Sequence, residues 1–246
     1  MTLFDNGIQK KIMINVQCHS VQRSIEIEDK FHGCILVGVT AKDFPDLEEG
    51  VRFISELQKK DVGVSAGLGD GSAAQWSRAL ELAIRTNPIH LNQIFPAASL
   101  SQHALKALGH RTLVNALIRP SGRPGYVCIS TGPVSEGQEN GVISVDTAAA
   151  MLSEVGVQSL KFFPIEGTKH LDELAEVARA AGKFGMAIEP TGSITPENVA
   201  AVVKTCIKAG AEHIMPHLYG SLKNRETGEL EEEKLSTAYK NIKAAL

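Results

Sequence analysis

The strongest constraint on this chain is a regular alternation of short apolar segments and longer amphipathic segments. Short apolar runs bounded by turn residues are typical of buried β-strands, and apolar residues three or four positions apart are typical of helices. Eight strand-like runs occur, at residues 12–17, 34–40, 62–66, 89–93, 112–117, 159–163, 186–189 and 213–217. Their first residues lie 22 to 28 positions apart, with one wider gap, which is the length of a strand, a helix and two turns.

Eight such units predict a (β/α)8 barrel, also called a TIM barrel. An open doubly wound sheet is the alternative, but it would more naturally stop at five or six strands. The 246 residues fit one α/β barrel domain, and no low-complexity linker divides them. We therefore expect residues 1–246 to form a single domain.

The wider gap lies between the fifth and sixth strands. It contains a segment rich in Pro and Gly at residues 119–125, followed by a β-rich segment at residues 126–131. This pattern predicts a turn and an extra strand pair, a hairpin inserted after the fifth strand. Loops that follow barrel strands carry the active site, so the insertion is either a lid or wall of that site or a surface hairpin.

Composition narrows the possible partners and the compartment. The formal charge of −3 gives no basic footprint for nucleic acid, and no run of about 18 apolar residues would span a membrane. The four cysteines contain no CxxC pair and fit free thiols in a reducing compartment. No secretory signal precedes the first strand, so we expect a cytoplasmic protein.

One lysine lies in the middle of the sixth apolar run. A cation inside a buried strand is costly unless it is paired or loses its proton. A desolvated, neutral lysine is a nucleophile that forms Schiff bases with carbonyl compounds. Lys161 is therefore a candidate nucleophile; the alternative is a strand-end lysine that reaches solvent along its alkyl stem.

Strand parity extends this argument to the other strands, because alternate side chains of a barrel strand face the interior and the helix layer. Leu160 and Phe162 suit the helix layer, which turns Lys161 inward. The same count predicts an inward polar ring of Asn15, Ser65, His90, Asn92, Asn115, Lys161, Glu189 and His217. A packed barrel interior favours Val, Ile and Leu. The ring therefore predicts a catalytic cavity, although each residue taken singly also fits a structural role.

The loop after the seventh strand has features of an anion site. Gly192 allows close backbone approach, Thr191 and Ser193 supply hydroxyl groups, and Thr195-Pro196 fits a helix N-cap followed by a first-turn proline. Helix N-termini bind phosphate, and barrels often use the loops after strands seven and eight for it. A second glycine-rich loop at residues 67–71 is expected to shape the rim of the site.

These motifs resemble a known enzyme family. Residues 160–164 (LKFFP) followed by residues 190–194 (PTGSI) resemble the Schiff-base lysine and phosphate loop of class I 2-dehydro-3-deoxy-6-phosphogluconate aldolases. Most of the chain is similar to the longer branch of these aldolases, associated with D-glucosaminate catabolism. The segments that carry this similarity are residues 36–39 (LVGV), 92–95 (NQIF), 129–133 (ISTGP) and 214–219 (IMPHLY).

The resemblance implies cleavage of a six-carbon phosphorylated 2-keto acid to pyruvate and glyceraldehyde 3-phosphate, without a cofactor or a metal. It also implies a homo-oligomer, because barrel aldolases commonly self-associate. Two departures stand out. The shorter aldolases carry a proton-shuttling glutamate on the second strand, whereas residues 34–40 contain no carboxylate, and their phosphate loop usually has glycine where Ser193 stands.

The general base is therefore open. We expect Lys161 to attack the C2 ketone and Glu189, on the neighbouring strand, to take the C4 hydroxyl proton, with His217 and Asp43 as alternatives. The substrate carboxylate and hydroxyls are assigned to some of Asn15, Asn92 and Asn115 together with the loop after the third strand, and the phosphate to Thr191, Gly192 and Ser193.

Three other functions fit parts of the pattern. A metal-dependent pyruvate aldolase could use Glu189, His90 and His217, although no HxH or HExxH spacing supports it. A phosphosugar isomerase or epimerase could use the same barrel and phosphate loop. A noncatalytic phosphosugar-binding protein is the third alternative.

Overall fold

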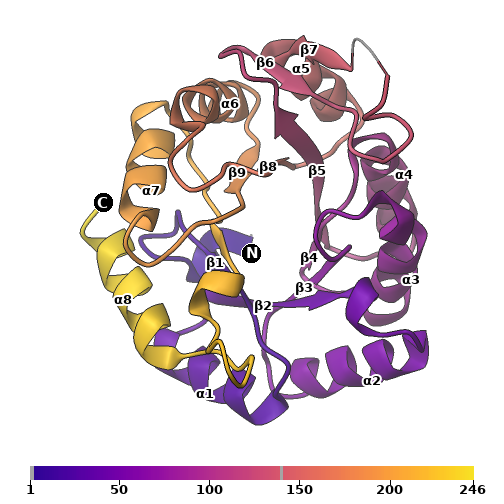
Figure 1. Cartoon of the computed structure of the whole chain (residues 1–246). Coiled ribbons are helices and arrows are strands. Elements are labelled where there is room, and N and C mark those ends of the chain that lie inside the picture. Colours follow the sequence, from indigo (N-terminus) through magenta and orange to yellow (C-terminus); the bar gives the residue numbers. More distant parts are fainter. Residues whose placement is uncertain (1–2, 139–140) are drawn as a thin grey trace.

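The computed structural model, which describes residues 3–138 and 141–246, confirms the predicted (β/α)8 barrel. Figure 1 looks along the barrel, with strands around the centre and helices in an outer ring. Consecutive barrel strands pair in parallel. The last strand pairs with the first, and parallel bridges between Ile188 and Ile214 and between Thr191 and His217 close the ring.

The barrel strands of the described chain are β1 (Ile14–Gln17), β2 (Ile35–Thr40), β3 (Val64–Gly67), β4 (His90–Leu91), β5 (Leu113–Pro120), β8 (Ser159–Phe162), β9 (Ala187–Pro190) and β10 (His217–Leu218). The helices are α1 (Val21–Phe31), α2 (Leu47–Gln58), α3 (Trp76–Thr86), α4 (Phe95–Ala107), α5 (Val145–Glu154), α6 (Leu171–Lys183), α7 (Val199–Lys208) and α8 (Glu232–Lys243). Short 3-10 turns are η1 (Leu3–Asn6), η2 (Ala41–Asp43), η3 (Ala73–Gln75) and η4 (Gly220–Leu222).

Local chemistry explains where several helices begin. The side chain of Ser20 accepts a hydrogen bond from the Arg23 amide at the start of α1, and Ser144 does the same for Thr147 at the start of α5. Such caps satisfy amides that have no partner inside the helix. Helices and strands then pack through a continuous layer of buried aliphatic side chains, which includes Phe162 of β8.

Two strands are only two residues long, where five residues were predicted for each. The eighth covers His217–Leu218 only, because Pro216 has no amide to donate and interrupts the ladder with the first strand. The fourth ends at Leu91, where the side chain of Asn92 donates to the carbonyl of Ala66. Neither difference changes which side chains face inward.

The segment after β5 forms two further strands, β6 (Tyr126–Cys128) and β7 (Val142–Ser144); β6 pairs antiparallel with β5, and β7 pairs antiparallel with β6. Glu173 of α6 anchors the first turn of this segment, because its carboxylate accepts hydrogen bonds from the amides of Ser121 and Gly122 at 2.8 and 3.0 Å. Its described residues from 121 to 144 line neither of the two cavities described below. This placement favours the surface alternative over a lid.

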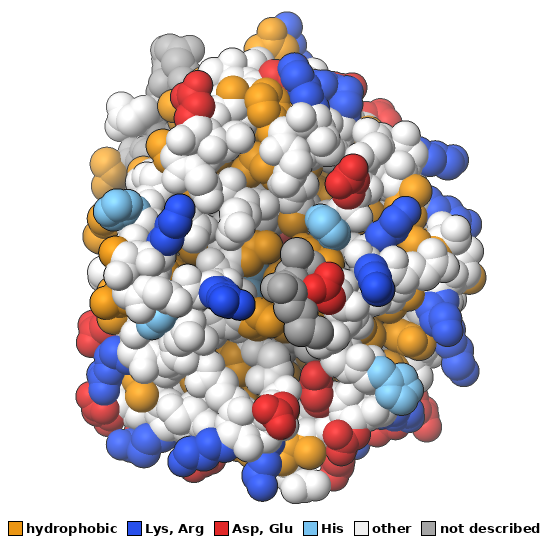
Figure 2. All heavy atoms as spheres, turned by 180° about the vertical axis from the view of Figure 1, so that it is seen from behind, with side chains coloured by type: hydrophobic (Ala, Val, Ile, Leu, Met, Phe, Trp, Pro, Cys, Tyr) orange, Lys and Arg blue, Asp and Glu red, His pale blue; other side chains and the backbone are white. Residues whose placement is uncertain are grey.

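The barrel interior has an apolar lower end. Phe4 from η1 packs with four side chains from strands or from the residues just before them, and these five residues form a buried cluster of Phe4, Met13, Leu36, Ala187 and Met215. The polar ring lies above this floor, toward the carboxyl ends of the strands. Figure 2 shows the face turned away from the viewer in Figure 1, where positive and negative side chains are interspersed around the rim. No helix of the described chain is long and apolar enough to span a bilayer.

Candidate active site

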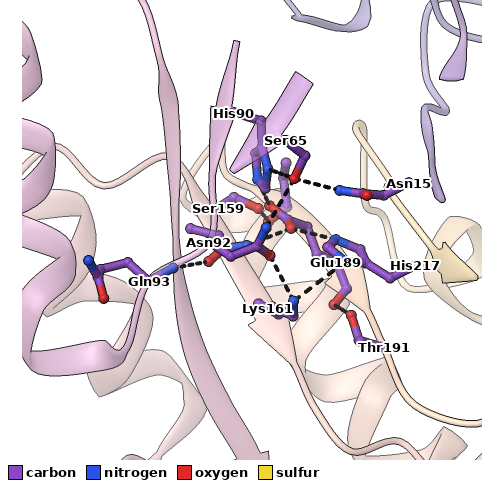
Figure 3. Close-up of polar contacts among 12 residues, drawn as sticks. Asn15, Ser65, His90, Asn92, Gln93, Ser159, Lys161, Glu189, Thr191 and His217 are labelled. Carbon is purple, nitrogen blue, oxygen red and sulfur yellow. Dashed lines mark hydrogen bonds and ion pairs between the residues drawn. The ribbon is translucent and has the colours of Figure 1, made fainter. Parts of the chain in front are cut away.

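All eight residues of the predicted polar ring meet in one hydrogen-bonded network inside the barrel (Figure 3). They come from seven strands or strand ends that lie far apart in the sequence. Strand parity therefore predicted correctly which side chains turn inward. The roles assigned to them stay predictions.

Lys161 lies at the top of the network. Its Nζ donates to Asn92 Oδ1 at 2.7 Å and approaches His217 Nδ1 at 3.4 Å. Burial lowers the pKa of Lys161 to about 8, against the opposing attraction of Glu189. At pH 7 roughly one amine in ten is then neutral, compared with about one in 3,000 for an ordinary lysine. The site thus supplies a nucleophilic amine near neutral pH.

Glu189 lies below Lys161 and is completely buried. One carboxylate oxygen accepts from His90 Nε2 at 3.0 Å, and the other accepts from His217 Nε2 at 2.9 Å and Asn115 Nδ2 at 2.7 Å. Burial would raise the pKa of Glu189, but the two imidazoles outweigh burial and hold the pKa well below its usual value. Glu189 is therefore an ionised acceptor.

These contacts fix the tautomer of His217. Because Nε2 donates to Glu189, Nδ1 carries the lone pair that faces Lys161. Burial, followed by the charge of Lys161, lowers the pKa of His217 to about 3, so the ring is neutral at working pH. Glu189, His217 and Lys161 thus form a hydrogen-bonded chain, in which His217 and Lys161 line a cavity and Glu189 does not.

The remaining members hold the network in one orientation. Ser65 Oγ bonds His90 Nδ1 at 2.8 Å and accepts from the amides of Asn15 and Asn92 at 2.8 and 3.0 Å. Asn115 Nδ2 donates to Asn92 Oδ1 at 2.9 Å, and Lys161 Nζ donates to the same oxygen. The two donors together fix the orientation of the Asn92 amide. Fully satisfied networks of this kind make side chains rigid.

Two cavities of about 260 and 480 Å³ meet at Lys161. The first extends toward β1, β2 and the glycine-rich loop after β3, and its lining includes Gln17, His19, Lys42, Asp43 and Lys223. The second extends over the loops after β9 and β10, and its lining includes Phe163, Thr191, Gly192, Ser193, Gly220 and Ser221. Asp70, Gly71, Lys161 and Tyr219 line both.

The second cavity has the features of an anion site. Ser193 adopts a positive φ of 53°, so it holds the left-handed conformation that glycine usually supplies. Within the described chain the amides of Gly192 and Ser193 donate to no protein acceptor, and the buried Ser221 Oγ has no hydrogen-bond partner. Helix α7 begins at Val199, after a turn in which Thr195 and Asn198 bond each other reciprocally, and not near Pro196 as predicted.

The predicted site residues separate by depth. Lys161, His217, Asn92, Thr191, Gly192 and Ser193 line the cavities, whereas Asn15, Asn115 and Glu189 lie one layer below. Asp43 lies at the rim, where Oδ2 accepts from Thr40 and Gln17. Sequence reasoning did not identify Tyr219 and Ser221. Parity with His217 was the only signal for Tyr219, and Ser221 gave none.

Fold and site together define an enzyme of the (β/α)8-barrel class, with its polar cavity at the carboxyl ends of the strands. Solved structures of similar fold include thiamine phosphate pyrophosphorylase of Pyrococcus furiosus, at 10% identity and a TM-score of 0.56, covering 96% of each chain. The 3-keto-L-gulonate-6-phosphate decarboxylase of Vibrio cholerae gives 12% identity and a TM-score of 0.57, covering 96% of this chain and 99% of that one. These similarities show the fold alone.

The chain belongs to the KDGP aldolase family, whose sequence model matches residues 8–226. It is 35% identical to the 2-dehydro-3-deoxy-phosphogluconate aldolase of Salmonella typhimurium over 241 residues, which is 97% of this chain and 98% of that protein. The predicted membership in this aldolase family, a family of carbon–carbon lyases, is confirmed.

Proposed function

We propose that the protein cleaves 2-dehydro-3-deoxy-6-phosphogluconate to pyruvate and glyceraldehyde 3-phosphate through a Schiff base on Lys161. The neutral amine adds to the C2 ketone and water leaves, which gives an iminium. Removal of the C4 hydroxyl proton lets the C3–C4 electron pair move toward the iminium, so the aldehyde departs and an enamine remains. Protonation at C3 and hydrolysis then release pyruvate and free the lysine.

The observation that carries this proposal is the position of the Lys161 amine. It lies where two cavities meet, with a lowered pKa and two acceptors that hold it in place. The name of the Salmonella relative supports the choice of substrate.

We assign the direct proton transfer to His217 and a supporting role to Glu189. His217 presents a free Nδ1 lone pair toward Lys161 and lines the second cavity, whereas Glu189 reaches that cavity only through His217. The buried carboxylate fixes the imidazole and stabilises it when it takes a proton. This arrangement keeps Glu189 in the proton path and makes His217 the group that meets the substrate.

The phosphate is assigned to the second cavity, where the unpaired amides of Gly192 and Ser193 and the hydroxyl of Ser221 surround one space. The keto-acid end is then placed toward the first cavity, whose lining includes Lys42 and Lys223. Lys161 lies where the two cavities meet, as attack on C2 requires.

One experiment tests the covalent step. Borohydride added with pyruvate should leave a reduced adduct on Lys161, detectable by mass spectrometry of the digested protein. Lys161→Met should retain less than about 10⁻³ of the cleavage rate, because loss of a covalent nucleophile lowers rates by that order or more. The control is Lys169→Met, which removes an exposed lysine paired with Glu166 just beyond β8. An adduct on another lysine, or normal turnover without Lys161, would overturn the assignment.

The lysine adduct, the effect of a chelator and the identity of the products separate the competing functions. Among the described residues no group of three or more His, Cys, Asp or Glu side chains is arranged to hold a metal ion. A metal-dependent aldolase would lose activity to a chelator and form no lysine adduct. An isomerase or epimerase would leave the carbon count of the substrate unchanged, and a binding protein would leave the substrate intact.

A further inference from the structure

Tyr219 follows β10 and reaches across β1 to β2 inside the barrel. Its hydroxyl lies over Gly38: a Cβ added at that glycine would be 2.4 Å from Tyr219 Oη. Tyr219 and Lys161 are the two side chains from the barrel strands and their ends that line both cavities. Gly38 thus makes room for the phenol hydroxyl of a side chain that shares both cavities with the reactive amine.

The network determines which way this hydroxyl points. His90 Nε2 donates to Glu189, so His90 Nδ1 accepts from Ser65 Oγ. Ser65 Oγ then accepts from Asn15 Nδ2, which turns Asn15 Oδ1 toward Tyr219. The Tyr219 hydroxyl therefore donates its hydrogen to Asn15 at 3.1 Å, which leaves the oxygen lone pairs free to accept, on a side chain that lines both cavities.

This hydroxyl stays protonated during turnover. Burial raises the pKa of Tyr219 above its usual value, and the negative charges of Glu189 and Asp43 act in the same direction. Tyr219 is therefore a neutral hydrogen-bond acceptor with a fixed orientation and not a base. Such a group recognises a neutral hydroxyl of the substrate.

We infer that Tyr219 Oη accepts the hydrogen bond of the C5 hydroxyl, the substrate hydroxyl that does not react. This inference rests on the proposed function. The C4 hydroxyl gives its proton to His217, which leaves the C5 hydroxyl as the one free hydroxyl of the substrate that does not react, and Tyr219 lines the same two cavities as Lys161. Asp70 is the other acceptor shared by both cavities, but it is 83% exposed and pairs with Lys42 at 2.7 Å. Tyr219 is thus a specificity-determining residue.

The test is the condensation of pyruvate with two aldehydes, which is the reverse of cleavage. One aldehyde is glyceraldehyde 3-phosphate, whose 2-hydroxyl becomes the C5 hydroxyl of the product. The other is the analogue of glyceraldehyde 3-phosphate that lacks this 2-hydroxyl. The wild-type protein should prefer the hydroxylated aldehyde in kcat/KM by roughly tenfold or more, because the analogue leaves a buried acceptor unpaired. Tyr219→Phe should reduce this preference to near unity while the borohydride-trapped pyruvate adduct on Lys161 forms normally. The control Tyr239→Phe, on α8 against Phe31, should keep the wild-type preference.

A preference that survives in Tyr219→Phe would overturn the inference. A wild-type protein that joins neither aldehyde to pyruvate would instead overturn the proposed function. Gly38→Ala provides an independent check, because its methyl group displaces Oη without removing it. This variant should lose the preference as Tyr219→Phe does, and the double variant should show no further loss. If Gly38→Ala does not fold, the ratio measured with Tyr219→Phe still decides the question.

Discussion

At the scale of single residues, the chemistry depends on which of three buried groups, Glu189, His217 and Lys161, carry a proton. Glu189 is ionised, His217 is neutral with its proton on Nε2, and Lys161 exchanges its proton near pH 8. The amine can therefore lose a proton to the cavity or to His217 without unpairing the carboxylate.

The first prediction concerns pH. Burial lowers the pKa of Lys161 to about 8 from an ordinary value of 10.5, so the neutral fraction grows about tenfold per pH unit up to pH 8 and then levels. The initial rate of borohydride-trapped adduct formation with pyruvate should follow this curve. A midpoint near 10.5 would show that the amine is not desolvated in solution.

The second prediction separates His217 from Glu189. Removing a general acid–base group typically lowers kcat by about 10² to 10⁴, so His217→Gln should lose cleavage by that order and still form the pyruvate adduct. If Glu189 acts through His217, the double variant with Glu189→Gln should be about as slow as His217→Gln alone. Multiplied losses would mean that Glu189 reaches the substrate by itself. The control is His213→Gln, because His213 stacks on Phe4 at the lower end of the barrel.

At the scale of elements, we propose the loops after β9 and β10 as the recognition site for phosphate. Each supplies a serine, and the two serines reach the same cavity from neighbouring strand ends. Ser193 holds a positive φ, so glycine can replace it without strain.

The third prediction follows from this geometry. A hydrogen bond to a charged group contributes about 1.5 to 3 kcal/mol, so Ser193→Gly and Ser221→Ala should each raise KM for the phosphorylated substrate by roughly tenfold or more. Adduct formation with pyruvate should not change, because the ketone end lies at Lys161. The control is Ser153→Ala on the exposed side of α5. Equal damage to both measurements would mean that the serines support the fold and do not bind phosphate.

The elements also show where sequence reasoning reached its limit. Strand parity identified the inward side chains because alternation holds along every barrel strand. Parity predicts whether a side chain faces the barrel interior or the helix layer. It does not predict how far below the cavities the side chain lies, because that depends on how neighbouring strands are staggered. It therefore could not separate Asn15 and Asn115, below the cavities, from Asn92, which lines one. Tyr219 shares the parity of His217 but lies beyond residue 217, where the predicted strand ends, so the parity count did not include it.

At the scale of the whole molecule, the buried network links catalysis to stability. The folded protein keeps His217 neutral down to about pH 3, whereas the unfolded chain protonates it near 6.5. Glu189, whose pKa is lowered in the folded state, adds a loss at lower pH. Because the unfolded state binds more protons, the free energy of unfolding must fall as pH falls through this window.

The fourth prediction is therefore a steep acid dependence. One proton contributes about 1.4 kcal/mol per pH unit, so the urea midpoint of the wild-type protein should fall steadily from pH 6.5 toward pH 4. His217→Gln should show a shallower decline over that range, whatever its stability at pH 7. Parallel declines in the two proteins would show that His217 is protonated in the folded state.

The cytoplasmic location and the homo-oligomer stay predictions. A solution mass compared with the 26.4 kDa chain tests the homo-oligomer.

The contact between Gly38 and Tyr219 also restricts how this barrel can be redesigned. One volume inside the barrel holds either a side chain on β2 or the phenol ring that arrives from the end of β10, but not both. An engineer who installs a carboxylate at position 38, to move the proton donor to the second strand, must shorten residue 219 in the same step. The two positions behave as one designable unit, although almost the whole chain separates them in sequence.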